Sequence, residues 1–328
     1  MNKIKALLIT LFVVAAILVA GYFYLLHPTT IAQPSLSATL QTQTITINGH
    51  KRTYHYYLPK NVKATPALVF VFHSSLSNGN TIRQRTAYQF DVIADKKGFI
   101  VVYPDGYQRH WNDCRASADY AANTENINDV KFVSKIIDWF ASQHQINTKR
   151  VYATGYSNGG HLSFRLAMET PNLVAAIAPI AANLPIDKNL DCKKSGQPVA
   201  VALFNGTADA FNPHHGGLVS ILGNDSRGKV LSSQDTINYW LNLAGYQNSI
   251  GVKKQLSDIN LQDGSTVEKS TWIQDNRPEI NLYTLQGAGH TIPSKRVRLG
   301  GLFGQTNGDI EAAHEVWKFF ERDWQRRQ

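Results

Sequence analysis

Residues 155–160 read Gly-Tyr-Ser-Asn-Gly-Gly, so the hydroxyl of Ser157 stands among residues with very little side chain. Glycines allow a sharp bend and a close approach of other backbone segments. A serine held at such a bend can attack a carbonyl carbon once a neighbouring base removes its proton. The alternative is a glycine-rich turn that contains a serine without chemical purpose. The segments on either side decide between the two.

A strand precedes Ser157 and a helix follows it. Residues 150–154, Arg-Val-Tyr-Ala-Thr, have the β-branched and aromatic character of a strand. Residues 161–170 read as a helix that ends before Pro171. A Gly-x-Ser-x-Gly motif between a strand and a helix is the nucleophile elbow of α/β-hydrolases, in which an acid and then a histidine follow the serine along the chain. We therefore expect Ser157 to be a nucleophile.

The general base is expected among the histidines beyond Ser157. His290 lies in Gln-Gly-Ala-Gly-His-Thr, directly after the apolar run Ile-Asn-Leu-Tyr-Thr-Leu, and a loop at a strand end suits a base. His314 lies within a helical pattern, where a surface or packing role is expected. His214 and His215 follow the candidate acid too closely to be its independent partner, and no further ligand spacing indicates a metal. We predict His290 as the base and no metal site.

The acid is expected at another strand end. Val-Ala-Val-Ala-Leu-Phe runs into Asn-Gly-Thr-Ala-Asp, which places Asp209 in the loop after this strand. Asp187 and Asp191 lie in a polar loop, and Asp235 opens a helix and is a candidate cap. Asp209 in the catalytic role would orient His290 and stabilise its protonated ring. The alternative is an aspartate that only forms a turn.

An oxyanion hole needs two donors near the serine. The backbone N–H of Asn158, the residue after the nucleophile, supplies one. The loop after the buried strand at residues 67–73 supplies the other, and we expect the amide of Ser75, with Ser74 as the alternative.

A mostly parallel sheet must position these residues. Apolar runs suited to buried strands alternate with helical patterns, which is typical of an α/β fold with helices on both faces of the sheet. Asn48-Gly49 between two alternating segments predicts a β-hairpin near the start. The expected buried strands are residues 67–73, 99–106, 150–155, 175–183, 198–206 and 280–287, and the clearest helices are residues 88–97, 129–144 and 309–324.

The first 26 residues differ from the rest. Residues 6–26 carry no charge over 21 positions, follow two lysines, and are long enough to span a bilayer. We expect an uncleaved signal anchor; a signal peptide cut near Ala38 is the alternative. Residues 27–42 are expected to form a flexible tether, and residues 43–328 a single catalytic domain that is exported to the periplasm or the cell exterior.

Charge and cysteine content add two expectations. The net charge is +9, but lysines and arginines are scattered without interleaved aromatics, so nucleic-acid binding is not expected. Export and an even number of cysteines favour a disulfide between Cys114 and Cys192, against the alternative of two buried thiols.

Several motifs in order resemble one esterase family. They are Tyr-Pro-Asp-Gly at 103–106, Trp-Asn-Asp at 111–113, Asn-Asp-Val-Lys-Phe-Val at 128–133, Gly-Tyr-Ser-Asn-Gly-Gly-His at 155–161, Asn-Gly-Thr-Ala-Asp at 205–209 and Gly-Ala-Gly-His-Thr-Ile-Pro at 287–293. Together they resemble the polyhydroxybutyrate depolymerases and the related feruloyl and acetylxylan esterases, over residues 54–320. The resemblance implies an α/β-hydrolase fold, no metal or organic cofactor, and a triad of Ser157, Asp209 and His290.

The resemblance also suggests a substrate pocket. Trp111 and Asn112 match a pocket motif of the family, although a tryptophan in a loop is equally often part of the core. Tyr156, His214 and Ile292 are the other expected pocket residues.

The chain departs from the family pattern at three places. His73-Ser74 stands where the family has His-Gly, and serine restricts the backbone of the oxyanion loop more than glycine does. Ile292 stands in place of a tryptophan, and Asn128-Asp129 in place of Asp-Asp. The last two changes are expected to alter the pocket rather than the chemistry.

The expected reaction is ester hydrolysis through an acyl-enzyme, on small or soluble esters such as hydroxyalkanoate oligomers, acetylated sugars or aromatic acid esters. A peptidase with the same triad and a non-catalytic binding protein on a hydrolase scaffold are the alternatives. The sequence does not indicate an oligomeric state.

Overall fold

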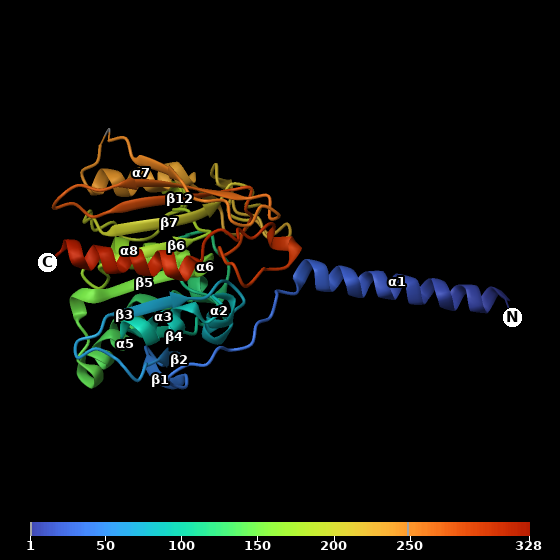
Figure 1. The fold of residues 1–328 in the computed structure, drawn as a ribbon, viewed down its shortest axis with the longest axis horizontal. Helices are drawn as coiled ribbons and strands as arrows, with labels where there is room; N and C mark the ends of the chain where they lie inside the picture. The colour runs from blue at the N-terminus through green and yellow to red at the C-terminus, as the bar shows by residue number, and fades with distance from the viewer. Residues whose placement is uncertain (1, 248) are drawn as a thin grey trace.

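A ten-stranded sheet forms the centre of the molecule. The computed structural model describes residues 2–247 and 249–328. The strands lie in the order β1-β2-β4-β3-β5-β6-β7-β12-β11-β10 (Figure 1). Their bounds are β1 Gln41–Ile47, β2 His50–Tyr57, β3 Leu68–Phe72, β4 Ile100–Pro104, β5 Val151–Tyr156, β6 Ala176–Ile180, β7 Ala200–Gly206, β10 Val252–Gln255, β11 Thr266–Trp272 and β12 Ile280–Gln286.

The middle of this sheet is parallel and the two edges are antiparallel. Strands β4, β3, β5, β6, β7 and β12 run in the same direction, whereas β1, β2, β11 and β10 pair antiparallel at the edges. Asn48 and Gly49 between β1 and β2 have φ of 49° and 86°. Two positive φ values are those of a tight hairpin turn, as the Asn-Gly pair predicts. The predicted α/β-hydrolase architecture with a mostly parallel sheet is confirmed.

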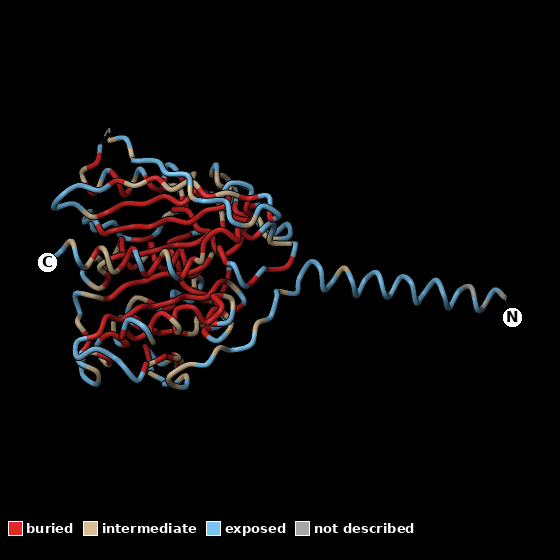
Figure 2. The backbone as a smooth tube through the Cα atoms, in the orientation of Figure 1, coloured by how far each residue is buried: buried red, intermediate tan, exposed pale blue. Residues whose placement is uncertain are grey.

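Helices cover both faces of the sheet because its strands are apolar on both sides. Leu68, Phe70 and Phe72 of β3 belong to one buried cluster, and Val69 and Val71 to the other. The helices α5 Asp129–His144, α6 Asn158–Glu169 and α7 Ser233–Leu243 pack in the first cluster, and α3 Gln89–Lys97 and α8 Ala312–Arg326 in the second. Figure 1 shows α8 crossing the middle of the sheet, and Figure 2 shows that the strands beneath it are buried.

Short elements connect this framework. They are α2 Gly79–Arg85, α4 Ala121–Thr124, the 3-10 turns Thr148–Arg150, Asp187–Asn189 and Gly301–Phe303, and a small antiparallel pair, β8 Gly217–Leu218 and β9 Lys229–Val230. The final helix begins at Ala312, three residues later than predicted. Asp309 lies in the preceding loop, where its Oδ1 accepts hydrogen bonds from the backbone N–H groups of Ile259 and Asn260.

The N-terminal helix α1, Asn2–Leu26, extends away from the globular body, and its residues from Leu7 to Leu26 are exposed except for the half-buried Gly21 (Figures 1 and 2). Its residues Leu7–Leu26 are long and apolar enough to cross a membrane, which also fits a signal sequence. The segment that follows contacts the body at several points. The N–H of Thr29 donates to the carbonyl of Arg298 (2.8 Å), and Ser37 Oγ donates to Asp95 Oδ1 (2.5 Å).

The two cysteines form the predicted disulfide, which links Cys114 and Cys192 across 78 positions of sequence. It joins the loop after β4 to the loop after β6, and both loops lie beside the site described next.

Candidate active site

Ser157 lies at a strained turn between β5 and α6. Its φ is 56° and its ψ is −116°, a backbone conformation that residues with side chains rarely adopt. The glycines around it are required by close packing. A methyl group on Gly155 would overlap the backbone of Gly159, and one on Gly159 would overlap the carbonyl oxygens of Phe72 and His73. The local sequence therefore forms the elbow that exposes a serine above the sheet.

Asp209 and His290 meet at the same edge of the sheet. They follow β7 and β12, which are parallel neighbours, so both loops leave from the same end. Asp209 Oδ2 lies 2.7 Å from His290 Nδ1, and Asp209 Oδ1 accepts the backbone N–H groups of Phe211 (2.8 Å) and Asn212 (2.7 Å). These bonds fix the position of the carboxylate and orient the ring so that Nε2 is the nitrogen left for the serine. His290 and Ser157 line one narrow crevice.

A buried tyrosine fixes the loop that carries His290. Tyr156 precedes the serine, is 1 % exposed, and donates its hydroxyl hydrogen to the backbone carbonyl of His290 (2.6 Å). Burial raises the pKa of the Tyr156 phenol, so this group remains a donor at any ordinary pH. The elbow and the histidine loop are thus bonded directly to each other.

The loop after β3 brings Ser75 to the crevice. His73 Nε2 accepts the N–H of Gly106 (2.8 Å), so the ring hydrogen is on Nδ1, which donates to the carbonyl of Ser74 (2.7 Å). In a trans peptide the N–H points opposite to the carbonyl, so the N–H of Ser75 points away from His73. Ser75 lines the crevice with Ser157. Neither Ser74 nor Ser75 has a positive φ, so the serine in place of the family's glycine fits this loop.

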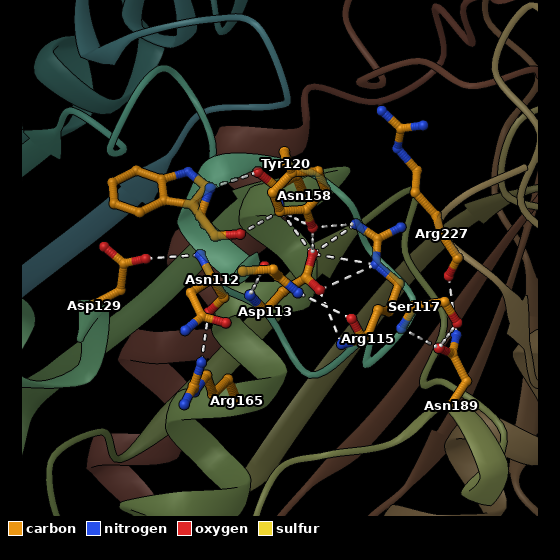
Figure 3. Close-up of polar contacts among 12 residues, drawn as sticks. Asn112, Asp113, Arg115, Ser117, Tyr120, Asp129, Asn158, Arg165, Asn189 and Arg227 are labelled. Carbon is orange, nitrogen blue, oxygen red and sulfur yellow. Dashed lines mark hydrogen bonds and ion pairs between the residues drawn. The ribbon is translucent and has the colours of Figure 1, made fainter. Parts of the chain in front are cut away.

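The residue after the nucleophile is held by a buried polar network. Asn158 Oδ1 accepts the backbone N–H of Trp111 (2.8 Å), and Asn158 Nδ2 donates to Asp113 Oδ2 (2.6 Å) (Figure 3). Asp113 also accepts from Arg115 Nη2 and from the Tyr120 hydroxyl, both at 2.6 Å. The backbone N–H of Asn158 is at the first turn of α6, where helix N–H groups have no partner within the helix. The network fixes the direction of this N–H.

Electrostatics keep this network charged. The Arg115 guanidinium and its hydrogen bonds outweigh the burial penalty on Asp113, so the pKa of this carboxyl lies well below its usual value. For His73 the burial penalty is larger than the effect of its hydrogen bond to Ser74, and it lowers the pKa to about 4. His73 is therefore neutral at physiological pH, as its two hydrogen bonds require.

The expected pocket residues lie around the crevice rather than in its lining. Trp111 and Asn112 are buried; Trp111 Nε1 donates to the carbonyl of His73 (2.9 Å), and the backbone N–H of Asn112 donates to Asp129 Oδ2 (2.7 Å). Ile292 is buried in the apolar cluster that also contains α3 and α8. His214 lines a separate hollow beside Trp272. Ser74, the alternative oxyanion residue, accepts from Arg85 through its hydroxyl (3.1 Å).

The residues that do line the crevice were mostly missed by sequence reasoning. Besides Ser75, Ser157 and His290 they are Arg115, His161, Phe211, Asn212, Val219, Ile221 and Arg227. His161 could have been found, because it lies four residues after Ser157 and therefore on the same face of α6. The other six lie in loops where no periodicity marks their direction. Within the described chain, no cluster of three or more His, Cys, Asp or Glu side chains suits a metal ion.

Comparison with known proteins finds esterases. Residues 52–184 match the family model described as esterase PHB depolymerase. Over this region, which is less than half of the chain, the protein is similar to the PHB depolymerase esterases. The matched segment includes Ser157 and the Asp113–Asn158 network, whereas the loops of Asp209 and His290 lie beyond it.

Proteins similar to this chain carry esterase names. The chain is 29 % identical over 281 residues to the bifunctional acetylxylan esterase/xylanase XynS20E of Neocallimastix patriciarum, which covers 84 % of this chain and 34 % of that protein. It is 32 % identical over 181 residues to feruloyl esterase D of Neurospora crassa, covering 52 % of this chain and 57 % of the other. The chain therefore spans about a third and somewhat over half of these relatives.

A solved acetyl xylan esterase from Aspergillus awamori shares the fold. The TM-score is 0.52 at 19 % identity, and the superposition covers 77 % of this chain and 95 % of the other.

Proposed function

We propose that this protein is a serine esterase that hydrolyses carboxylic esters through an acyl-enzyme. His290 Nε2 takes the proton of Ser157 Oγ as the oxygen attacks the ester carbonyl, and the amides of Ser75 and Asn158 hold the oxyanion. The imidazolium then gives the proton to the leaving alcohol. Water repeats the sequence on the acyl-enzyme, which releases the acid and restores the serine.

The hydrogen bond between Asp209 Oδ2 and His290 Nδ1, next to a crevice shared with Ser157, carries this proposal. The strained φ of Ser157 adds to it, because a strained serine is expected where function requires its position. The family match and the esterase names of the relatives support an ester over an amide substrate.

The crevice favours a small acyl group. Phe211, Val219 and Ile221 narrow it with apolar side chains, so a short acyl chain would fit the space in front of Ser157. The relatives are named for acetylxylan and feruloyl esters, and we place this enzyme among hydrolases of such acyl esters, with hydroxyalkanoate oligomers as the further candidate.

The proposed location is outside the cytoplasm. The disulfide requires an oxidising compartment, and α1 supplies either a signal peptide or a membrane anchor. We favour the anchor, because the helix is of full spanning length.

The decisive test is Ser157→Ala in the full-length protein, purified in detergent and assayed with 4-nitrophenyl acetate. Loss of the nucleophile is expected to lower kcat by about 10⁴-fold or more. Ser163→Ala is the matched control, since Ser163 is a buried serine of the same helix whose hydroxyl bonds to the carbonyl of Gly159. The proposal fails if the Ser157 variant cleaves the ester as fast as the control.

A further inference from the structure

Unpaired polar atoms gather around the crevice. Among the described residues, buried side-chain atoms without a hydrogen-bond partner include Arg227 Nε and Nη1, both amide atoms of Asn212, and His161 Nδ1. All three residues line the crevice with Ser157 and His290. Proteins pair nearly all of their buried polar groups, so each unpaired group needs an explanation. Five of the sixteen unpaired atoms of the described residues belong to this one crevice, where a polar ligand would satisfy them.

Arg227 is the strongest of these groups. It is 8 % exposed and lies in the loop between β8 and β9. Arg115 lines the same crevice but is paired with Asp113 at 2.6 Å. Figure 3 shows the Arg227 side chain extending away from that pair, and Arg227 takes part in none of the ion pairs of the described chain. The crevice therefore holds one guanidinium that forms no direct ion pair with a carboxylate of the described chain.

The loop that carries Arg227 is held in place through its backbone. Asn189 Nδ2 donates to the carbonyl of Arg227 (2.9 Å), and Asn189 Oδ1 accepts from Ser117 Oγ (2.5 Å), as Figure 3 shows. A buried, uncompensated guanidinium is costly for folding. The backbone of Arg227 is nonetheless held in place. A fixed backbone under an unpaired side chain is the arrangement expected of a residue that binds a ligand rather than one that stabilises the fold.

The charge and shape of this guanidinium select one class of ligand. Arginine stays protonated and presents a planar fork that matches a carboxylate in two parallel hydrogen bonds. The apolar side chains of Phe211, Val219 and Ile221 line the same crevice. A short aliphatic chain with a carboxylate at its far end satisfies both features.

We propose that the preferred ester of this enzyme carries a free carboxylate on its acyl part, and that Arg227 binds this carboxylate while the ester carbonyl lies at Ser157. The inference rests on the proposed esterase function and names the substrate class of the same site. Arg227 determines specificity and takes no part in the bond-breaking steps.

The test compares charged and neutral esters of equal length. The substrates are the mono-4-nitrophenyl esters of adipic, pimelic and suberic acid, each paired with its methyl ester, in which the carboxylate is masked. For at least one chain length, wild-type kcat/KM is expected to be about 10-fold or more higher for the free acid, the usual effect of a hydrogen bond to a charged group. Arg227→Gln should remove this preference, because it lowers kcat/KM about 10-fold more for the free acid than for the methyl ester.

Lys229→Gln is the matched control. Lys229 is exposed in the neighbouring strand β9, so this change alters the net charge equally without touching the crevice. The control should keep the preference of the wild type. Equal rates on both esters at every chain length, or a preference that survives Arg227→Gln, would overturn the proposal.

A binding measurement separates this proposal from the esterase function. Calorimetry on the Ser157→Ala variant compares monomethyl adipate, pimelate and suberate with their dimethyl esters. The tightest anion is expected to bind about 10-fold more tightly than its neutral partner, and Arg227→Gln in the same background should abolish the difference. If the wild type cleaves no ester, the esterase proposal fails while this difference still tests Arg227. Equal binding of anion and neutral ester contradicts the role of Arg227.

Discussion

Two arginines line one crevice, and their surroundings are opposite. Arg115 donates to Asp113, which also accepts from Tyr120 and Asn158, so its charge is compensated within the protein. Arg227 has two nitrogen atoms without any partner and takes part in no ion pair of the described chain. Both side chains are buried, so exposure to solvent does not explain the difference.

The comparison separates two tasks of buried charge. The Arg115–Asp113 pair is bonded to Asn158, whose backbone N–H is a proposed oxyanion donor. These bonds fix the direction of that N–H before the substrate binds. Arg227 has no such bonds to break, which leaves its guanidinium ready to bind a charged group of a ligand. A buried charge that positions other residues needs its partner in the protein, whereas one that recognises a ligand leaves room for the partner.

The largest expected effect comes from breaking the ion pair between Arg115 and Asp113. Asp113→Asn keeps the shape of the side chain but leaves Arg115 as an uncompensated buried charge. Loss of one partner of such a pair typically costs about 3–5 kcal/mol, and we expect the free energy of unfolding in urea to fall by this amount. Esterase activity should fall as well, because the side-chain amide of Asn158 loses its one charged acceptor, which is also the nearest of its three acceptors.

Glu321→Gln is the control for this variant. Glu321 pairs with Lys97 at the surface, at 3.0 Å, with both side chains partly exposed. Removing an exposed pair is expected to cost less than about 1 kcal/mol. Equal losses of unfolding free energy in Asp113→Asn and Glu321→Gln would show that the Asp113 network does not hold the site.

Acid is expected to destabilise the protein through His73. Burial lowers the pKa of His73 to about 4, whereas the unfolded chain takes up a proton near pH 6.5. Below pH 6.5 the unfolded state therefore binds more protons, and stability is lost as the pH falls from about 6.5 to about 4. The loss due to His73 is on the order of 3 kcal/mol, since one pKa unit corresponds to about 1.4 kcal/mol.

His73→Gln tests this expectation, because glutamine is neutral throughout. The difference in unfolding free energy between wild type and variant should shrink from pH 7 to pH 4. Asp113 acts at lower pH: its pKa is also depressed, so its contribution is lost only below the usual carboxyl range. A difference that stays constant from pH 7 to pH 4 would show that His73 is not the group that titrates.

The sequence predicted the framework because its signals are local. Continuous apolar runs mark strands that are buried on both faces, and the end of a strand fixes where the next loop begins. Ser157, Asp209 and His290 were predicted on this basis, and the structure places all three at one edge of the sheet. Their catalytic roles remain a proposal.

The lining of the crevice could not be predicted in the same way. Tyr156 was expected in the pocket, but its ring packs in the buried cluster that also contains α8. Arg115 and Arg227 are brought near the site by loops that depend on distant contacts. The Cys114–Cys192 disulfide and Asn189 hold these loops. No local sequence pattern predicts that these two contacts bring Arg115 and Arg227 to the site.

The smallest expected effect on the free energy of unfolding comes from replacing Arg227. Arg227→Met replaces an uncompensated buried charge with an apolar side chain of similar length, and no protein carboxylate is left without a partner. We expect the free energy of unfolding to stay unchanged or to rise by about 1 kcal/mol, opposite in sign to the effect of Asp113→Asn. Urea titration of both variants measures the two values. A loss of more than about 1 kcal/mol in Arg227→Met would mean that Arg227 stabilises the fold, and the contrast between the two arginines would disappear.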